Sequence, residues 1–321
     1  MDYREELIAT VASLYYQLNQ SQSQIAARLD LSNSTVSRLI REARDKGIVQ
    51  ISVRMPIPRD IKLEQIFIER FQLKDIYILR TMPDAPEPHL MDSIGQLASN
   101  YIERIVEHFD KDDMMGVAWG VGVQAAVSAL PDNTAHSIDV VQLLGGVGAS
   151  IAHGPDITRM VAQKLGGQYY DLHAPVIVER AENRDLFMKE PVVNENIQRA
   201  YQVKLAVSGI GSVQDEASSF LRAKLLHRDE LRMLRAENIV GEICGQFFDQ
   251  HGNHDYDINH RIIGIDLDHL RQIPNSIAIA RGILKAHSIL GVLNGRFVKV
   301  LATDDVTARA VLELANMKTP H

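Results

Sequence analysis

The chain has 321 residues, 45% of them hydrophobic and 23% charged, and it carries a formal net charge of −7. This length fits two domains, or one small and one large, and the apolar content can fill a sizeable core. The single cysteine, Cys244, excludes an internal disulfide framework, and no apolar run approaches the ~18 residues of a membrane span, so we expect a cytoplasmic protein without membrane contact.

The charge is unevenly distributed along the chain. Residues 1–60 hold eight Lys/Arg and seven Asp/Glu, a net charge of +1, which leaves −8 for the remainder. An acidic body repels DNA, whereas the locally basic segment 34–54 can approach phosphate. We therefore expect a DNA-binding domain over residues 1–55 and a second domain over residues 56–321. We call this first domain the head. Its modest positive charge suggests that one copy binds DNA weakly, and an oligomer that presents several heads would raise the effective affinity.

Residues 5–18 predict an opening helix, and residues 22–49 predict a helix, a short turn and a second helix, together an all-α head. Ser32 or Asn33 is expected to cap the second helix, because a short side-chain oxygen can accept from its free amides. Small hydroxyls at the start of a helix, followed by arginines, suit docking in the major groove of DNA. The polar residues that lie mostly off the apolar stripe of this helix are the expected DNA contacts: Ser34, Thr35, Ser37, Arg38, Arg41 and Arg44.

The alternative for this stretch is a helical hairpin with a solvated basic face, since basic faces are common. The combination of turn, hydroxyls and arginines favours DNA binding, and the stretch resembles the helix-turn-helix head of bacterial transcriptional regulators. Such turns usually carry Gly where this chain has Asp30, but Asp tolerates a left-handed backbone better than most residues.

Residues 49–53 alternate like a short strand, a wing beside the second helix, and Pro56 and Pro58 mark a linker. Residues 61–71 predict an amphipathic helix. Its apolar side belongs either to the core or to a subunit contact, and it comprises Leu63, Ile66, Phe67 and Phe71.

The remainder alternates between apolar strands and amphipathic helices. Such alternation is typical of an α/β domain with a parallel sheet that is covered on both faces. Strands are predicted at 74–79, 114–118, 138–144, 203–208, 262–265, 276–280 and 297–301, and helices at 90–108, 121–130, 156–165 and 283–293.

Glycine-rich loops follow three predicted strands, at residues 119–122, 145–148 and 209–212. One such loop is as well explained by a tight turn, but three in corresponding positions favour a ligand site at the carboxyl ends of the strands. They match neither a dinucleotide fingerprint nor a P-loop. The glycines that we expect at this site are Gly120, Gly122, Gly146 and Gly148.

Charged residues follow later strands. Asp249 ends a short aromatic strand, and Arg281 and Lys285 lie about one helical turn apart just past another. Such an Arg/Lys pair can bind an anion or hydroxyls, although a solvated helix face is the alternative. Asp304 can cap the last helix or pair with Arg281. His251 and neighbouring acids lack a convincing metal spacing, so no metal is expected.

The order of these motifs resembles the SorC family of sugar-binding bacterial transcriptional regulators. The resemblance rests on the head, on residues 116–120, on Gly145-Gly146, on residues 241–249, on 280–286 and on 301–304. It implies a fold similar to ribose-phosphate isomerase and glucosamine-phosphate deaminase, an effector that is a small sugar or phosphorylated sugar, and a homo-oligomer, expected as a tetramer built as a dimer of dimers.

The resemblance also implies which residues line the effector pocket: Gly120, Gly122, the 146–148 loop, Asp249 and Lys285. Many relatives carry a hydroxyl residue, often Thr, where this chain has Gly122, and that hydroxyl helps to hold phosphate. The departure leaves open whether the effector of this chain is phosphorylated.

Two functions from different classes fit these observations. The first is a regulator of a carbohydrate-uptake or catabolism operon, whose operator affinity is controlled by a sugar-like effector and which needs no cofactor. The second is a sugar-phosphate isomerase or deaminase, in which Asp249 and Lys285 serve as acid/base or Schiff-base groups. A DNA-binding head accounts for a function that needs no catalysis, and the sequence shows no arrangement of a nucleophile with a general base. We therefore expect a regulator and not an enzyme.

Overall fold

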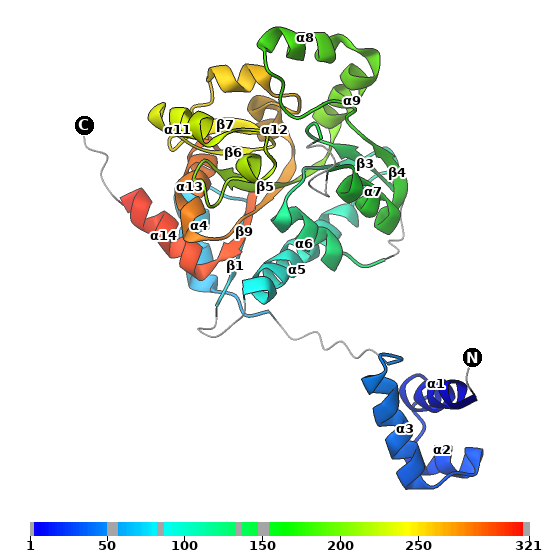
Figure 1. Ribbon diagram of the computed structural model, residues 1–321. Helices are drawn as coiled ribbons and strands as arrows, with labels where there is room; N and C mark the ends of the chain where they lie inside the picture. Colours follow the sequence, from blue (N-terminus) through cyan, green and yellow to red (C-terminus); the bar gives the residue numbers. More distant parts are fainter. Residues whose placement is uncertain (1–2, 50–56, 82–86, 133–136, 147–153, 317–321) are drawn as a thin grey trace. The chain divides into compact units, whose positions relative to one another are not determined.

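The structure is a computed structural model that describes residues 3–49, 57–81, 87–132, 137–146 and 154–316. The chain divides into two compact units, Met1–Pro56 and Ile57–His321. Figure 1 draws both units with their helices and strands labelled.

The first unit is a three-helix head, as predicted. Its helices are α1 (Tyr3–Tyr16), α2 (Gln22–Leu29) and α3 (Asn33–Asp45). Ser32 is the N-cap of α3, and its hydroxyl accepts from the amide of Thr35 at 3.1 Å. Asp30 adopts the left-handed backbone that the turn requires, with φ of 53°. The strand predicted at 49–53 falls almost entirely on residues that the structure does not describe.

The second unit is built on a parallel sheet, which confirms the predicted fold class. Seven strands follow the order β1-β9-β8-β5-β2-β3-β4, and all neighbours along this path pair in parallel. Apart from the edge strand β4, these strands are largely apolar and mostly buried, as expected for strands that are covered on both faces. The strands are β1 (Asp75–Leu79), β2 (Met114–Val117), β3 (Ile138–Gln142), β4 (Gly166–Tyr170), β5 (Leu205–Ser212), β8 (Asn275–Ile279) and β9 (Val300–Asp304).

Helices from distant parts of the chain cover this sheet (Figure 1). Helix α5 packs on α6 and on strands β1, β8 and β9, while α13 packs on α14 and β5. The helices of this unit are α4 (Ile61–Phe71), α5 (Glu87–Val106), α6 (Val121–Ala129), α7 (Gly154–Leu165), α8 (Ala181–Lys189), α9 (Pro191–Gln202), α10 (Ser219–Arg222), α11 (Arg228–Ala236), α12 (Leu267–Gln272), α13 (Ala286–Gly295) and α14 (Asp305–Asn316), with 3-10 turns η1 (Asp257–Arg261) and η2 (Ile283–Lys285).

The predicted loop at 209–212 is wrong, because β5 continues through Ser212. The strand pairs in parallel with β8 as far as Gly209 and then antiparallel with β6 (Ile239–Ile243) from Ile210 onwards. Strand β6 forms a hairpin with β7 (Gln246–Asp249). The β5 strand therefore leaves the parallel sheet and carries its last residues into a separate antiparallel ribbon.

The strand predicted at 262–265 is also wrong. This apolar segment makes only isolated bridges, Leu144 with Gly264 and Ile177 with Ile262. Strand β4 and helices α8, α9 and α11 were not predicted. The β4 sequence, GGQYY, has no β-branched residue, and α8 buries no side chain, so neither presents the apolar period by which an element is found.

Helix α4 has the predicted bounds, and the structure resolves what its apolar side does. Leu63 and Phe67 lie in the main core, and Phe71 is half-buried against it, whereas Ile66 is 47% exposed. The helix is therefore part of the core, and its N-terminal cap is Asp60, which accepts from the amide of Leu63 at 3.2 Å.

Candidate functional site

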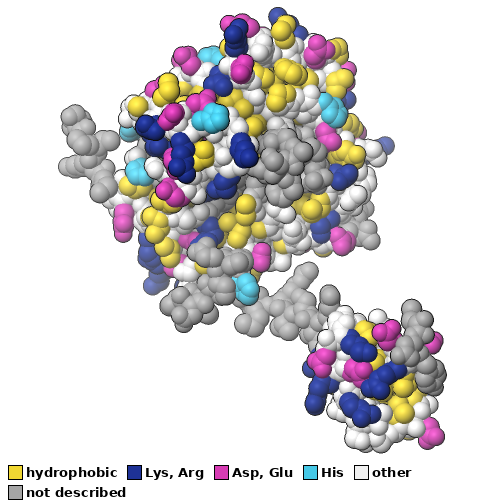
Figure 2. All heavy atoms as spheres, viewed as in Figure 1, with side chains coloured by type: hydrophobic (Ala, Val, Ile, Leu, Met, Phe, Trp, Pro, Cys, Tyr) yellow, Lys and Arg dark blue, Asp and Glu magenta, His cyan; other side chains and the backbone are white. Residues whose placement is uncertain are grey.

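The outer surface of α3 carries the residues expected to contact DNA. Val36, Leu39, Ile40 and Ala43 are buried in the head's core. Ser34, Arg38, Arg41 and Arg44 are exposed, while Thr35 and Ser37 are half-buried. Because residues three or four apart share a helix face, these arginines form one basic stripe. Figure 2 shows several Lys and Arg side chains on the visible face of the head.

The acidic neighbour within α3 is neutralised by two cations. Glu42 bonds to Arg4 of α1 at 3.0 Å and to Lys46 at 3.3 Å. The hydrogen bond from Arg4 is the main cause that lowers the pKa of Glu42. The same pair ties α1 to α3, so the basic stripe stands on a braced helix.

The hydroxyls at the start of α3 form a small network around its cap. The Ser32 hydroxyl lies 2.8 Å from those of both Ser34 and Thr35. These hydroxyls therefore hold the first turn of α3 in place. The Ser32 hydroxyl, which also accepts from the Thr35 amide, is fully used, whereas the hydroxyls of Ser34 and Thr35 keep capacity for a further partner.

A cavity of about 470 Å³ lies at the carboxyl ends of β2, β5 and β8 in the second unit. This is where ligands bind in open α/β sheets. Its walls are largely apolar, with four polar or charged side chains. The lining residues are Met91, Ala118, Trp119, Gly120, Val121, Gly122, Leu144, Gly209, Ile210, Gly211, Ser219, Arg222, Glu242, Cys244, Ile279, Ala280 and Lys285.

Two glycines bring the start of α6 close to the end of β8. Gly120 is the N-cap of α6 and has φ of 143°, a conformation that side chains disfavour. A Cβ on Gly122 would lie 2.8 Å from the carbonyl oxygen of Ile279. Any side chain at position 122 would therefore push the helix away from the sheet.

Glu242 enters the cavity because its neighbour across the ribbon is a glycine. Gly211 pairs with Glu242 in the β5–β6 register, and a Cβ on Gly211 would lie 1.8 Å from the Glu242 carboxyl oxygen Oε1. This carboxyl accepts from the hydroxyl of Ser219 and from the amide of Gly245, each at 3.1 Å. Burial raises the pKa of Glu242.

Lys285 is the basic counterpart of Glu242 in the cavity. Its Nζ donates to the carbonyl of Ile210 at 2.6 Å. Burial lowers the pKa of Lys285, nearby Arg222 adds to that effect, and the Glu242 charge opposes it. An acid and an amine of opposite charge thus share one enclosed space, and Arg222 adds an exposed cation to its lining.

The structure brings together three of the predicted effector residues, Gly120, Gly122 and Lys285. Asp249 lines a separate cavity of about 600 Å³, and its carboxyl accepts from the amides of His251 and Asn253, both at 2.8 Å. Asp249 therefore stabilises the turn after β7, and its carboxyl is used in hydrogen bonds within that turn.

The other predicted effector residues lie elsewhere. The Nε of Arg281 donates to Asp304 at 2.8 Å, which is one of the two roles predicted for Asp304, and Arg281 is not among the residues that line the cavity of Lys285. Gly146 exchanges backbone hydrogen bonds with Ala174 and Val176 and does not line the cavity. Gly148 lies outside the described residues.

Glu242, Ser219, Arg222 and Trp119 were missed as site residues. Glu242 stands in the same motif as Asp249, but its position opposite Gly211 follows from a hairpin register that the sequence does not reveal. Trp119 donates from Nε1 to the carbonyl of Gly145 at 3.4 Å, so its ring is fixed as a wall. Among the described residues no group of His, Cys, Asp and Glu could hold a metal ion.

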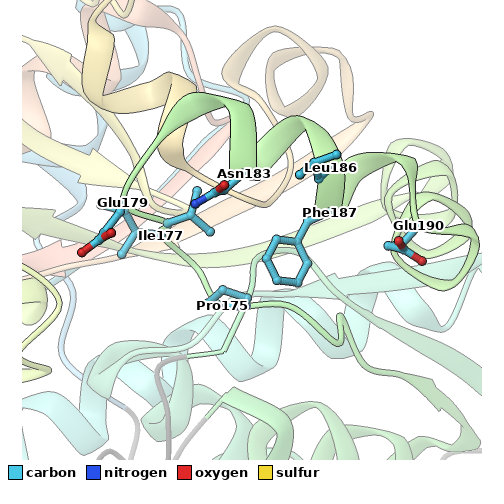
Figure 3. A pocket seen from close by; sticks show the side chains of 8 residues that line it. Pro175, Ile177, Glu179, Asn183, Leu186, Phe187 and Glu190 are labelled. Atoms are coloured by element: carbon cyan, nitrogen blue, oxygen red, sulfur yellow. The ribbon is translucent and has the colours of Figure 1, made fainter.

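A further cavity of about 450 Å³ lies beside α8 (Figure 3). Pro175, Ile177 and Phe187 provide apolar walls, and Glu179 and Glu190 are its charged side chains. Its polar groups do not converge as those around Glu242 and Lys285 do, so it is not the candidate site.

No helix within the described residues is long and apolar enough to cross a membrane.

Comparisons with known proteins place both units. Residues 55–313 match the Sugar-bind family of sugar-binding domains, and residues 19–50 match a family of winged helix-turn-helix DNA-binding domains. The deoxyribonucleoside regulator of Bacillus subtilis is 32% identical, over 96% of this chain and 98% of that protein. The sorbitol operon regulator SorC of Klebsiella pneumoniae is 28% identical, and its full-length crystal structure matches with a TM-score of 0.77 over 96% of this chain and 98% of that chain.

The raised pKa of Glu242 predicts a pH dependence of stability. A carboxyl whose pKa is higher in the folded state binds more protons when folded, so the free energy of unfolding falls as pH rises above the ordinary value of 4.5. Glu242→Gln removes this penalty, so the stability of the variant relative to the wild type should increase as pH rises above 4.5.

Urea unfolding at several pH values measures this difference. Glu216→Gln, which alters an exposed carboxyl, is the matched control and should run parallel to the wild type. A Glu242→Gln curve that also runs parallel to the wild type would mean that the carboxyl does not sit in the environment described above.

Proposed function

This chain belongs to the SorC family of sugar-binding bacterial transcriptional regulators, and from that premise we propose that the cavity around Glu242 and Lys285 binds the effector that sets the operator affinity of the head. The protein is a DNA-binding transcriptional regulator with a sugar-binding domain.

The convergence of polar groups on an apolar cavity is the observation that carries the proposal. A sugar presents hydroxyls at its edge and C–H groups on its faces. Glu242 can accept from hydroxyls, and Lys285 can donate to a hydroxyl or ring oxygen. The fixed Trp119 ring, with Ile210 and Ile279, offers apolar surface to the C–H groups.

The same cavity can also bind an anion, but through cationic side chains and backbone amides and not through side-chain hydroxyls. Lys285, Arg222 and the amides at the start of α6 can each attract a phosphate. Val121 and Gly122 provide no hydroxyl, and the close approach of Ile279 requires Gly at position 122. We propose a small sugar or sugar phosphate as the effector, with any phosphate held by Arg222 and Lys285.

The head supplies operator recognition in this proposal. We place α3 in the major groove, with Arg38, Arg41 and Arg44 on phosphates or guanines. Ser34, Thr35 and Ser37 lie near its first turn, where hydroxyls fit close to base edges. The operon is one for the uptake or catabolism of a carbohydrate, and the regulator acts in the cytoplasm, where operator DNA lies.

We further propose a homo-oligomer, a tetramer built as a dimer of dimers. Operators of helix-turn-helix proteins repeat with the spacing of two heads, so two copies must act together. A change in head spacing on effector binding then alters operator affinity steeply. The relatives are named as regulators, so we assign the Glu242–Lys285 pair to recognition and not to turnover.

Thermal melting against a panel of sugars, sugar alcohols and their phosphates tests the effector site. A ligand at one hundred times its dissociation constant stabilises the fold by ~2.7 kcal/mol. We expect a hit in the wild type that is lost in both Glu242→Gln and Lys285→Met, because Gln replaces one acceptor oxygen of the carboxyl by an NH2 group that cannot accept from a hydroxyl, and Met removes the amine donor. Arg222→Met should reduce only the hits that carry phosphate.

Asp249→Asn is the matched control, since Asn keeps an acceptor for the amides of His251 and Asn253. It should keep the wild-type response to the panel. A response that survives in Glu242→Gln and Lys285→Met but disappears in Asp249→Asn would move the effector to the neighbouring cavity and contradict the proposal.

Arg38→Ala tests the head. We expect it to weaken binding to DNA fragments selected from a random pool by about 1–3 kcal/mol if the guanidinium reads a base, or to lower the salt slope by about one if it contacts phosphate. Fluorescence anisotropy at several salt concentrations measures both. Arg232→Ala, on the exposed face of α11, should change neither. Loss of the ligand-induced melting shift in Arg38→Ala would contradict the division of roles.

A further inference from the structure

The first turn of α14 forms hydrogen bonds with two separate segments of the second unit. One side holds the loop that forms a wall of the effector cavity. The other side holds the segment Pro58–Asp60, through which the chain enters the second unit from the head. We call Pro58–Asp60 the leading segment.

The cavity side consists of residues 280–285. Ala280 and Lys285 both line the cavity, so the loop between them has both ends on its wall. In the middle of the loop, Arg281 Nε donates to Asp304 at 2.8 Å and the Gly282 amide donates to the Thr307 hydroxyl at 2.7 Å. A shift of Lys285 toward a ligand would therefore act on the first turn of α14.

The same turn is fixed internally by Asp304. Its second carboxyl oxygen accepts from the Thr307 amide at 2.7 Å and so caps the helix. Asp304 and Thr307 are each only 1% exposed. The buried carboxyl of Asp304 thus joins the cavity loop to the start of α14. If Arg281 moves, its bond to Asp304 must break, or Asp304 must move with it and disturb the cap on the Thr307 amide.

The other side of the turn reaches the leading segment. Asp305 accepts from the amide and hydroxyl of Thr81, at 3.0 and 2.7 Å. Arg309, one turn further along α14, bonds to Asp60 at 3.1 Å. The Asp60 amide donates to Ile78 at 2.9 Å, and the Arg80 amide donates to Pro58 at 2.8 Å, so the leading segment runs along the edge of β1.

The junction also contains an unused hydrogen-bonding group. The Thr303 hydroxyl, next to Asp304, is buried and has no hydrogen-bond partner within the described residues. A buried hydroxyl that makes no bond is unfavourable, so an alternative arrangement of this turn that pairs it would be favoured locally.

We propose that the first turn of α14 couples the effector cavity to the leading segment and so transmits effector binding toward the head. The inference rests on the proposed function for its biological meaning, but its physical content is a coupling between Arg281–Gly282 and Asp60–Thr81 within one unit. Coupling of this kind is reciprocal, so a change on either side must be felt on the other.

Hydrogen–deuterium exchange on the full-length chain, without any ligand, tests the coupling. Arg281→Met removes the bond to Asp304, and we expect the amides of Asp60, Arg80 and Thr81 to exchange about tenfold faster, the change that loss of one hydrogen bond gives. In the reverse direction, Thr81→Val combined with Arg309→Met should accelerate exchange of the Gly282 and Lys285 amides.

Arg271→Met is the matched control, because Arg271 is also a partly buried arginine that bonds an aspartate, Asp268 at 3.1 Å, and a backbone carbonyl. It should leave all these amides unchanged. If Arg281→Met accelerates them no more than Arg271→Met does, or if the reverse variant has no effect on Gly282, the coupling is contradicted. No ligand enters the measurement, so this failure is distinct from a failed ligand panel, which would contradict the effector site alone.

Discussion

The proposed effector site depends on one close approach, between Gly211 on β5 and the carboxyl of Glu242 on β6. Strand β5 begins as a central strand of the parallel sheet and ends in an antiparallel ribbon. This change of partner carries β6 over the carboxyl end of the sheet, and the missing side chain at Gly211 leaves room for a buried acid. Without that glycine the Glu242 carboxyl could not take this place, and the cavity would lose its acidic side chain.

The buried carboxyl of Glu242 and the buried amine of Lys285 stabilise each other's charged forms. A lone buried charge is costly, and hydrogen bonds together with a nearby opposite charge offset part of that cost. Here Glu242 has Ser219 and Gly245 as partners, and Lys285 has the Ile210 carbonyl. The remaining bonding capacity of both groups faces the cavity. A ligand with several hydroxyls can use it, which is the chemical reason for assigning a sugar to this site.

The sequence was sufficient for the head, the parallel sheet and half of the site. The α3 stripe, the Ser32 cap and the glycines at the start of α6 depend on local spacing, which is readable. Arg281 and Lys285 were also readable as a pair, but Arg281 pairs with Asp304 at the end of the neighbouring strand β9, a pairing that the sequence had offered only as one alternative. Glu242 could not be found, because its role depends on the register of a hairpin against β5. Strand β4 and helix α8 lack the apolar period, so propensity offered no signal for them.

If a ligand in the Glu242–Lys285 cavity controls the head, the affinity of the protein for operator DNA must depend on Lys285 once the ligand is present. We would titrate a selected operator fragment with wild-type protein and with Lys285→Met, each with and without the compound that gives the largest melting shift. The account predicts equal affinities without the compound, a change in the wild type when it is added, and no change in Lys285→Met. An equal response in both proteins, or no response in the wild type, would contradict it.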